Sequence, residues 1–400
     1  MRVFRLLVVL AIAANAVAQQ PAPPSPPPMA VSSSAGEIRI ERLATLEFPW
    51  GLAYLPDGRL LITEKPGRLR IWANGRLSEP LSGLPQISYL GTESEQGGLL
   101  DVAVDPNFTQ NNFIYLSYSE AAEKSNQIAE TGDARFGGYL DMSDNSIRGG
   151  AVARARLDGN ALRDVQVIWR QTPKTIGRGH FGHRLVFAPD GKLFITSGDR
   201  MRFDPAQDVS SNLGKVLRIN TDGTLPSDNP FAGKKAARGD IYSVGHRNML
   251  AAAIYPPSGR LWVFEMGPLG GDEVNVIEPG KNYGWPEVSN GDNYDSSAIL
   301  DHPSSKEFQQ PLRTWTPVVS PSGAMFYDGA LFPDWRGSVF VGGLSSMALV
   351  RLTTDGRRIA NEERIDMRRR IRDVIQAPDG AIVVIVDAPK GDLLRLTPAR

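Results

Sequence analysis

The sequence predicts an all-β protein, a six-bladed β-propeller, from three observations. Short runs rich in β-branched and aromatic residues recur along the chain, and six of them stand out. A turn signal precedes four of the six: Pro-Asp-Gly at 56–58, 189–191 and 378–380, and Pro-Ser-Gly at 257–259. No long stretch has the 3.6-residue apolar period of an amphipathic helix. A pair of β-sandwiches would use the same turn and strand units and is the alternative fold.

The six runs are irregularly spaced. In chain order they are residues 59–64, 112–117, 192–197, 260–265, 338–342 and 381–386. Their starts lie 53, 80, 68, 78 and 43 residues apart, which allows four short strands in each blade plus loops of variable length. Further strands are expected between them, such as residues 152–157, which end at the Asp158-Gly159 turn. Residues 120–150 are polar, Gly-rich and strand-poor, so we expect a long loop over one face.

The first 36 residues are expected to lie outside the propeller. Residues 1–18 are typical of a secretory signal peptide, with two arginines, a short apolar core and a small-x-small cleavage site at 16–18. The apolar core is too short to span a bilayer, and no later segment is long enough. Residues 19–36 are rich in Pro and Ser and predict an extended linker. The propeller domain is expected at residues 37–398 of a periplasmic or secreted protein.

Composition excludes several functional classes. The 400 residues are 41% hydrophobic, enough for a sizeable core, and carry a formal net charge of zero. Nothing global therefore suggests a nucleic acid or an anionic membrane as partner. Cysteine is absent, which excludes disulfides, thiolate metal sites and cysteine nucleophiles. An exported protein without disulfides must be stabilised by burial or by a bound ion.

Two of the chain's four histidines, His180 and His183, lie on a Gly-rich loop that leads into the run at 192–197. Histidine is the usual general base near neutral pH, and the neighbouring glycines would let a ligand approach the backbone. His180 is the candidate base, although a loop histidine taken alone is more often a solvated or hydrogen-bonded bystander. His183 is the weaker candidate, because Arg184 and the following strand suggest that it frames the turn.

Two later segments carry polar groups that suit a ligand. Arg247 and Asn248 would offer planar donors to a carboxylate or carbonyl at a strand-to-loop junction, or simply cap a turn. Residues 265–286 combine carboxylates with glycines and contain no His or Cys, which favours Ca²⁺ over Zn²⁺ if the segment binds metal at all. Asp272 and Glu273 are adjacent, so on a strand they point to opposite faces and only one can serve a given site.

The last candidate segment is a basic run at residues 368–372. On a strand, Arg370 and Arg372 share a face while Ile371 points away from it. Two guanidinium groups side by side repel each other unless an anion lies between them, so the pair suggests an anionic ligand. A basic surface edge is the alternative.

These segments resemble the soluble quinoprotein sugar dehydrogenases, the aldose, glucose and sorbosone dehydrogenases that use pyrroloquinoline quinone (PQQ). The resemblance covers nearly the whole chain after the linker and implies a six-bladed propeller. It rests on residues 48–58, 95–108, 177–185, 245–248 with the segment up to Trp285, 371–374 and 391–396.

The resemblance also implies roles for particular residues. His180 matches the family's general base, and Gln96 matches a glutamine that lines the sugar and quinone site. Four residues match contacts of the quinone: Arg247, Asn248, Arg370 and Arg372. Gly267 and Pro268 match carbonyl ligands of the Ca²⁺ beside PQQ, while Glu273 and Tyr283 match a second, structural Ca²⁺ site.

The implied activity is oxidation of an aldose at its anomeric carbon to a lactone. His180 would take the hydroxyl proton while hydride passes to the quinone, and an external electron acceptor would then reoxidise the cofactor. One position departs from the family pattern: where glucose-specific members have a lysine on the quinone, this chain has Ser345. The loss of that cation would weaken PQQ binding or require another donor nearby.

Two other functions remain open on the sequence. One is a Ca²⁺-dependent propeller lactonase or esterase that uses the same histidine and metal without a quinone. The other is a non-catalytic propeller that binds sugar or protein. The arginines favour the dehydrogenase, because a lactonase needs no tricarboxylate site. We expect a monomer or a homodimer, with an aldose as substrate, no nucleic-acid partner and no membrane span.

Overall fold

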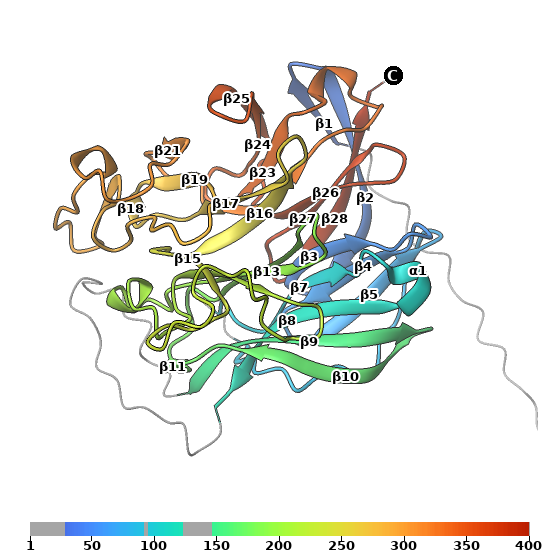
Figure 1. The fold of residues 1–400 in the computed structure, drawn as a ribbon. Coiled ribbons are helices and arrows are strands. Elements are labelled where there is room, and N and C mark those ends of the chain that lie inside the picture. The colour runs from blue at the N-terminus through green and yellow to red at the C-terminus, as the bar shows by residue number, and fades with distance from the viewer. Residues whose placement is uncertain (1–28, 92–94, 123–145, 400) are drawn as a thin grey trace, which may run out of the picture.

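The protein is a six-bladed β-propeller with almost no helix, as predicted (Figure 1). A computed structural model describes residues 29–91, 95–122 and 146–399. Neighbouring strands within each blade are antiparallel. Within the described residues, no helix is long and apolar enough to cross a membrane.

Blades 1 to 3 follow one another along the chain. Blade 1 contains β3 (Pro49–Tyr54), β4 (Leu60–Glu64), β5 (Arg68–Ala73) and β6 (Arg76–Leu77). Blade 2 contains β7 (Leu99–Val104), β8 (Phe113–Ala121), β9 (Ile147–Asp158) and β10 (Ala161–Arg170), with β11 (Thr175–Ile176) also paired to β9 and the short α1 (Phe108–Asn111) between β7 and β8. Blade 3 contains β12 (Gly182–Phe187), β13 (Leu193–Ser197), β14 (Lys215–Ile219) and β15 (Ile241–Val244).

Blades 4 to 6 complete the ring. Blade 4 contains β16 (Met249–Tyr255), β17 (Arg260–Glu265), β19 (Asp272–Val276) and β21 (Arg313–Trp315), and the small pair β18 (Leu269–Gly270) and β20 (Gly291–Asp292) lies beside it. Blade 5 contains β22 (Pro321–Phe326), β23 (Val339–Gly343), β24 (Ala348–Thr354) and β25 (Ile359–Asp366). Blade 6 contains β26 (Ile371–Gln376), β27 (Ile382–Val386), β28 (Gly391–Pro398), β2 (Gly36–Leu46) and β1 (Met29–Ser33).

The ring is closed by the N-terminal strand β2, which pairs with β28 from Ile38↔Pro398 to Leu46↔Gly391. Figure 1 shows blue β2 lying beside red β28. Strand β1 then pairs with β2, so among the described residues 29–33 already belong to the sheet, before the position 37 at which we expected the propeller to start. The reason is a hairpin turn at Gly36, with a φ of 95°, and side-chain contacts from the turn: Ser34 Oγ donates to Glu363 of blade 5.

The six runs that predicted the fold occupy equivalent positions. Each forms the second strand of its blade, counted from the axis: β4, β8, β13, β17, β23 and β27. The Pro-Asp-Gly and Pro-Ser-Gly turns join the innermost strand to this second strand, and the turn glycines have a positive φ, which costs a glycine little. The ends of the 120–150 segment extend β8 and β9 instead of forming a loop, and residues 123–145 lie outside the described part of the chain.

The hydrophobic core lies between neighbouring blades, where side chains from facing sheets interdigitate. Blades 1 and 2, for example, bury Leu61 and Leu69 against Leu99 and Ile114. The innermost strands contact one another in ring order, β3, β7, β12, β16, β22 and β26, and surround the axis of the propeller.

Arg184 lies at that axis and joins all six innermost strands. From β12, its guanidinium contacts Trp50 of β3, Asp101 of β7, the Leu250 carbonyl of β16, the Ser322 carbonyl of β22, and the Arg372 carbonyl and Asp373 of β26. The two carboxylates lie 3.2 and 3.1 Å from its Nη1. Because the Arg372 carbonyl is one of its partners, Arg184 also holds in place the backbone of Arg372, a predicted ligand-binding residue.

Candidate active site

His180 lies on the loop between β11 and β12 with a φ of 49°, a conformation that few non-glycine residues adopt. Its side chain is buried, and Nδ1 is 2.7 Å from Asp199 Oδ1. Asp199 also accepts hydrogen bonds from the Met201 backbone at 2.9 Å and from Trp285 Nε1 at 2.8 Å. These bonds hold the carboxylate in place.

The electrostatics of this pair define the protonation of His180. Burial alone would raise the pKa of Asp199, but its interaction with His180 and the charge of Arg247 hold it below its usual value. An ionised Asp199 makes His180 Nδ1 the hydrogen-bond donor, which leaves Nε2 as the free basic nitrogen. Burial and the charge of Arg247 lower the pKa of His180, so the ring is neutral at neutral pH and can accept a proton.

A dense set of hydrogen bonds fixes the loop that carries His180. The fully buried Arg200 donates to the carbonyls of Gly177 and Gly179 at 2.7 and 2.8 Å and stacks 3.7 Å from the Phe181 ring. Gln96 Oε1 accepts a hydrogen bond of 2.9 Å from the His180 backbone. The structure therefore brings two predicted site residues, Gln96 and His180, into direct contact.

His183 has a different environment. Both of its ring nitrogens are buried without a hydrogen-bond partner among the described residues. Burial, together with the charge of Arg200, lowers its pKa to about 3. The ring packs against Trp169 and Phe181 and lies over Gly150. It is thus a neutral packing group at the base of the loop.

Arg247 and Asn248 lie beside the His180 pair, because Arg247 is stacked over Trp285, which donates to Asp199. Arg247 donates to the carbonyls of Met266 and Gly267 at 3.0 and 2.8 Å. The buried Oδ1 of Asn248 has no hydrogen-bond partner within the described part of the chain. A buried acceptor of this kind costs free energy unless a ligand or water donates to it.

Arg370 and Arg372 share one partner that the sequence did not reveal. Both guanidinium groups bind Asp387, at 3.0 Å from Arg370 Nη2 and 2.8 Å from Arg372 Nη2. Burial alone would raise the pKa of Asp387, but Arg372, Arg370 and Lys65 lower it to about 2. An internal anion therefore separates the two arginines, so their proximity does not by itself require an anionic ligand.

Lys65 is a further buried cation at this place. Its ammonium donates to the Glu95 carbonyl at 2.7 Å, next to Gln96. Burial and the charge of Arg372 lower its pKa to about 8, so Lys65 lies within the electrostatic reach of that arginine. Ser345, by contrast, uses its hydroxyl on Ser320 Oγ at 2.8 Å and on the Val318 carbonyl.

The first predicted calcium site lies on the loop between β17 and β18. The Gly267 carbonyl already accepts from Arg247, and a carbonyl oxygen has a second lone pair for a cation. The Gly267 amide donates to Asp272, whose other oxygen accepts from the backbone of Val319 and Ser320. The oxygen-rich donor set suits Ca²⁺, and Pro268 adds the next carbonyl of the same loop.

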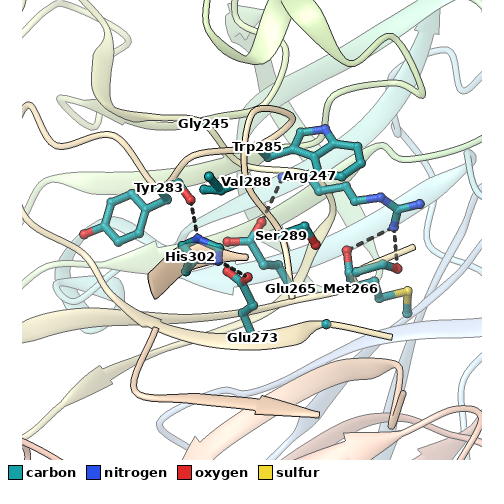
Figure 2. Close-up of a pocket in the computed structure, with 12 residues that line it drawn as sticks. Gly245, Arg247, Glu265, Met266, Glu273, Tyr283, Trp285, Val288, Ser289 and His302 are labelled. Atoms are coloured by element: carbon teal, nitrogen blue, oxygen red, sulfur yellow. Dashed lines mark hydrogen bonds and ion pairs between the residues drawn. The ribbon is translucent and has the colours of Figure 1, made fainter. Parts of the chain in front are cut away.

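The second predicted calcium site fits a metal less well. Figure 2 shows Glu273 and the Tyr283 carbonyl on the two sides of the His302 ring, 3.3 Å and 3.0 Å from its nitrogens. The cavity beside them has a volume of about 10 Å³, room for about one water molecule. Both predicted ligands thus lie against an imidazole, and the calcium site at Glu273 and Tyr283 stays a prediction. Asp272 and Glu273 contact different groups, as their adjacency predicted.

Direct contacts link two groups of candidate residues. One group runs from Lys65 and the Glu95-Gln96 backbone to His180, and from Asp199 and Trp285 to Arg247 and Gly267. The other contains Arg370, Arg372 and Asp387, whose charges act on Lys65 without a direct contact. Within the described residues, no cluster of three or more His, Asp or Glu side chains forms a metal site.

Sequence reasoning missed four members of this arrangement: Lys65, Asp199, His302 and Asp387. A signal for two of them was present. Asp199 and Asp387 follow the second strand of their blades by two and one residues, and Glu64 and Glu265 end the same strand in blades 1 and 4. Because second strands run in the same direction in every blade, these carboxylates gather at one face of the propeller.

Comparisons with known proteins identify the family. The family model described as Glucose / Sorbosone dehydrogenase matches residues 46–395. The chain is 38% identical over 364 residues to the aldose sugar dehydrogenase YliI of Escherichia coli, covering 88% of this chain and 91% of that protein. It is 27% identical over 431 residues to quinoprotein glucose dehydrogenase B of Acinetobacter calcoaceticus, covering 88% and 85%.

A solved structure gives the same result for the fold. The PQQ-bound form of aldose sugar dehydrogenase from Streptomyces coelicolor matches this chain with a TM-score of 0.69 at 25% identity. The match covers 90% of this chain and 98% of that one.

Proposed function

The chain belongs to the glucose/sorbosone dehydrogenase family, and on that basis we propose that it is a PQQ-dependent aldose sugar dehydrogenase. The family relationship makes it an oxidoreductase of the sugar dehydrogenase type. The proposal adds the cofactor, the aldose substrate, the lactone product and the residues that act. The observation that carries it is the buried His180–Asp199 pair, near which lie the buried cations Arg200 and Arg247.

The cofactor requirement fits the polar groups of this site. PQQ is a planar tricarboxylate quinone, and when bound it would accept the hydride released by the sugar. Arg247, Arg370 and Arg372 supply guanidinium groups for its carboxylates. The unpaired Asn248 Oδ1 supplies a buried acceptor for a donor on the ligand. These features support a planar anionic ligand better than they support a neutral sugar alone.

Lys65 replaces, in our proposal, the cation missing at Ser345. Its ammonium is buried near Arg372 and Asp387, and it has hydrogen-bonding capacity beyond its bond to the Glu95 carbonyl. Ser345 has no charge, and its hydroxyl is hydrogen-bonded to neighbouring backbone and side-chain groups. The buried ammonium of Lys65 would supply the positive charge that Ser345 lacks.

His180 is proposed as the general base. Asp199 holds its Nδ1 as a donor, so Nε2 is free to take the proton of the anomeric hydroxyl as the hydride leaves the same carbon. The positive ring formed in this step would be stabilised by the ionised Asp199. The carbonyls of Gly267 and Pro268 are proposed to hold a Ca²⁺ ion beside the cofactor, where it would supply Lewis-acid polarisation.

The remaining parts of the proposal rest on sequence alone. The segment 1–18, outside the described residues, supports a periplasmic or secreted protein. Electrons would leave to an external acceptor, and we propose a monomer or a homodimer.

The first test of this function is reconstitution of the full chain with PQQ and Ca²⁺, followed by dye reduction with a panel of aldoses. We expect PQQ-dependent reduction with at least one aldose. His180→Ala should lower turnover by about 10²- to 10⁴-fold, because it removes the base. The absorbance of the bound cofactor should remain nearly unchanged, since His180 is not among its binding groups.

The same preparation separates the alternatives. Hydrolysis of a lactone without dye reduction would contradict the dehydrogenase and favour a hydrolase. Loss of bound PQQ in His180→Ala would mean that His180 has a structural role instead of a catalytic one.

A further inference from the structure

Tyr294 lies between β19 and β21, outside the four strands of blade 4. We propose that it is a positioning residue, which holds the guanidinium group of Arg247 in the place from which that group binds the cofactor. The inference rests on the proposed function, because Arg247 is one of the groups proposed to bind PQQ. Tyr294 acts through Arg247 and is not itself a binding residue for the quinone.

The backbone of Arg247 is fixed on both sides. Its amide donates to Glu265 Oε2 at 2.8 Å, and its carbonyl accepts a hydrogen bond of 2.8 Å from the Asp199 amide. Glu265 and Asp199 are both buried. Because the backbone is held in this way, the position of the guanidinium group depends on the contacts of the side chain itself.

Backbone carbonyls hold one end of the guanidinium group. Arg247 Nη1 donates to the carbonyls of Met266 and Gly267 at 3.0 and 2.8 Å (Figure 2). Nε is buried and has no hydrogen-bond partner among the described residues. The edge of the group that contains Nε and Nη2 therefore needs other contacts to stay in place.

Tyr294 supplies such a contact at Nη2. Its hydroxyl oxygen accepts a hydrogen bond of 3.1 Å from Arg247 Nη2, and the centre of its ring lies 5.5 Å from Arg247 Cζ. The centre of the Trp285 ring lies 5.2 Å from the same atom. Both distances are within the range of about 6 Å over which an aromatic ring attracts a cation. One hydroxyl and two rings thus complete the contacts of the group.

The segment that carries Tyr294 is itself held in place. Strand β20 ends two residues before Tyr294 and pairs with β18. A Cβ atom at Gly271 would lie 2.5 Å from the Gly291 nitrogen, so these two segments approach each other closely. The Asn293 amide donates to the Ser297 carbonyl at 3.0 Å and closes a turn around Tyr294. The backbone at Tyr294 is therefore fixed on both sides of the residue.

The Tyr294 ring has a second set of contacts. It packs against a hydrophobic cluster that consists of Met201, Phe203, Ala206 and Trp285. Trp285 in turn donates to Asp199, the partner of His180. These contacts hold the ring, and the ring can therefore hold Arg247.

A guanidinium group that is held before the ligand arrives loses less conformational entropy on binding. Tyr294→Leu removes the ring and the hydroxyl, so it should raise the Kd for PQQ by about 10-fold. Tyr294→Phe keeps the ring and removes one hydrogen bond, so it should raise the Kd by about 3-fold.

Fluorescence titration of the full chain with PQQ in the presence of Ca²⁺ measures these constants. Tyr255→Leu is the matched control, because Tyr255 is a half-buried tyrosine at the opposite end of β16 from Arg247. This variant should keep the wild-type Kd. A wild-type Kd in Tyr294→Leu would overturn the proposal. If that variant does not fold, an unchanged Kd in Tyr294→Phe would overturn it instead.

A double-variant cycle shows whether Tyr294 acts through Arg247. Arg247→Met should weaken PQQ binding by about 10- to 100-fold, because it removes one charge-assisted contact. In that background, Tyr294→Leu should add less than about 2-fold, since no guanidinium group is left to position. A further loss of about 10-fold would mean that Tyr294 acts independently of Arg247, and the proposal would be wrong.

The cofactor-free protein separates this inference from the proposed function. In urea denaturation, the losses of stability caused by Arg247→Met and Tyr294→Leu should not add, because both remove the same contact. A wild type that binds no PQQ would contradict the proposed function and the cofactor role of Tyr294, while non-additive losses would still establish that Tyr294 holds Arg247. Additive losses would overturn the inference whether or not the chain binds PQQ.

Discussion

At position 180 the backbone adopts a positive φ, and the side chain is held by one carboxylate while its other nitrogen is free. This arrangement stores strain in the loop, and the hydrogen bonds of Arg200 and Gln96 offset it. Residue identity alone left His180 open as a bystander. The contact with Asp199 is what makes it a plausible base.

Asp199→Asn should lower kcat at pH 7 by about 10²-fold, because the neutral amide no longer stabilises the protonated ring. The pKa of the wild-type His180 lies below its usual value, so kcat/KM should stay high until the pH falls below about 6.5. Since Asp199 raises that pKa, its removal should move the acidic limb to still lower pH. A pH–rate profile measures this, with the exposed Asp222→Asn as control. An acidic limb that moves upward would contradict the assignment.

Lys65→Met should weaken PQQ binding by about 10- to 100-fold, the loss of one charge-assisted hydrogen bond. Fluorescence titration of the full chain with PQQ measures the Kd, and Lys65→Arg should remain close to the wild type. Because a lysine loses its charge above its pKa, which is about 8 here, wild-type affinity should fall as the pH rises through that value. The exposed Lys235→Met should keep both the affinity and its pH dependence. Equal affinities of Lys65→Met and wild type would remove Lys65 from the site.

At the scale of elements, strand β9 packs directly against His183, at the base of the His180 loop, because residue 150 is a glycine. A Cβ atom at Gly150 would lie 1.7 Å from the His183 ring, far inside van der Waals contact. The ring therefore passes directly over the strand, and no larger residue fits there. This close approach explains how a buried histidine without hydrogen-bond partners can lie at the base of the loop.

Gly150→Ala should destabilise the protein by about 3 kcal/mol or more, because the strand or the His183 ring must move. His183→Ala alone should cost less, since it leaves a cavity instead of an overlap. In the double variant the two effects should be strongly non-additive, because the second change removes the obstacle. Urea denaturation of the four proteins gives the coupling free energy. Simple additivity would mean that the strand relaxes elsewhere.

At the scale of the whole molecule, one side chain closes the ring. Arg184 contacts every innermost strand, and two of its partners are buried carboxylates from blades 2 and 6. Blade 6 also contains both ends of the domain, because β2 pairs with β28. Closure of the propeller thus depends on a strand pair at the rim and on a guanidinium group at the axis.

Arg184→Met should lower the free energy of unfolding by about 3–5 kcal/mol at pH 8, because Asp101 and Asp373 remain buried without their cation. Burial raises the pKa of both carboxyls, that of Asp373 to about 6, while Arg184 lowers them. Without Arg184 they would take up protons more readily in the folded state, so the loss should be smaller at pH 5 than at pH 8. Urea unfolding at both pH values tests this, with the exposed Arg163→Met as control. An equal loss at both pH values would contradict it.

Much of the fold was open to prediction from the sequence, and less of the site. Hydrophobic runs and Gly-containing turns are local signals, and the six runs proved to be equivalent strands of six blades. The start of the folded region was placed too late, because the pairing of β1 with β2 is a property of the hairpin and not of the Pro-rich composition before it. The family resemblance assigned His180, Gln96 and Arg247 to one site; the structure brings Gln96 and His180 into contact and places Arg247 over Trp285, while their roles stay predictions.

By itself, the sequence determined the strand units, the turns between them and the kinds of group available: a histidine on a Gly-rich loop, an oxygen-rich segment and paired arginines. Only the tertiary structure decided what each group faces. Asp199 is paired with His180, and Asp387 is paired with both Arg370 and Arg372. The charges of those two arginines and of Asp387 also act on the buried ammonium of Lys65. The imidazole of His302 meets the two oxygens expected to bind calcium. The physical reason is that strand periodicity is local, whereas a propeller gathers its site from loops of different blades, whose side-chain partners no spacing along the chain can specify.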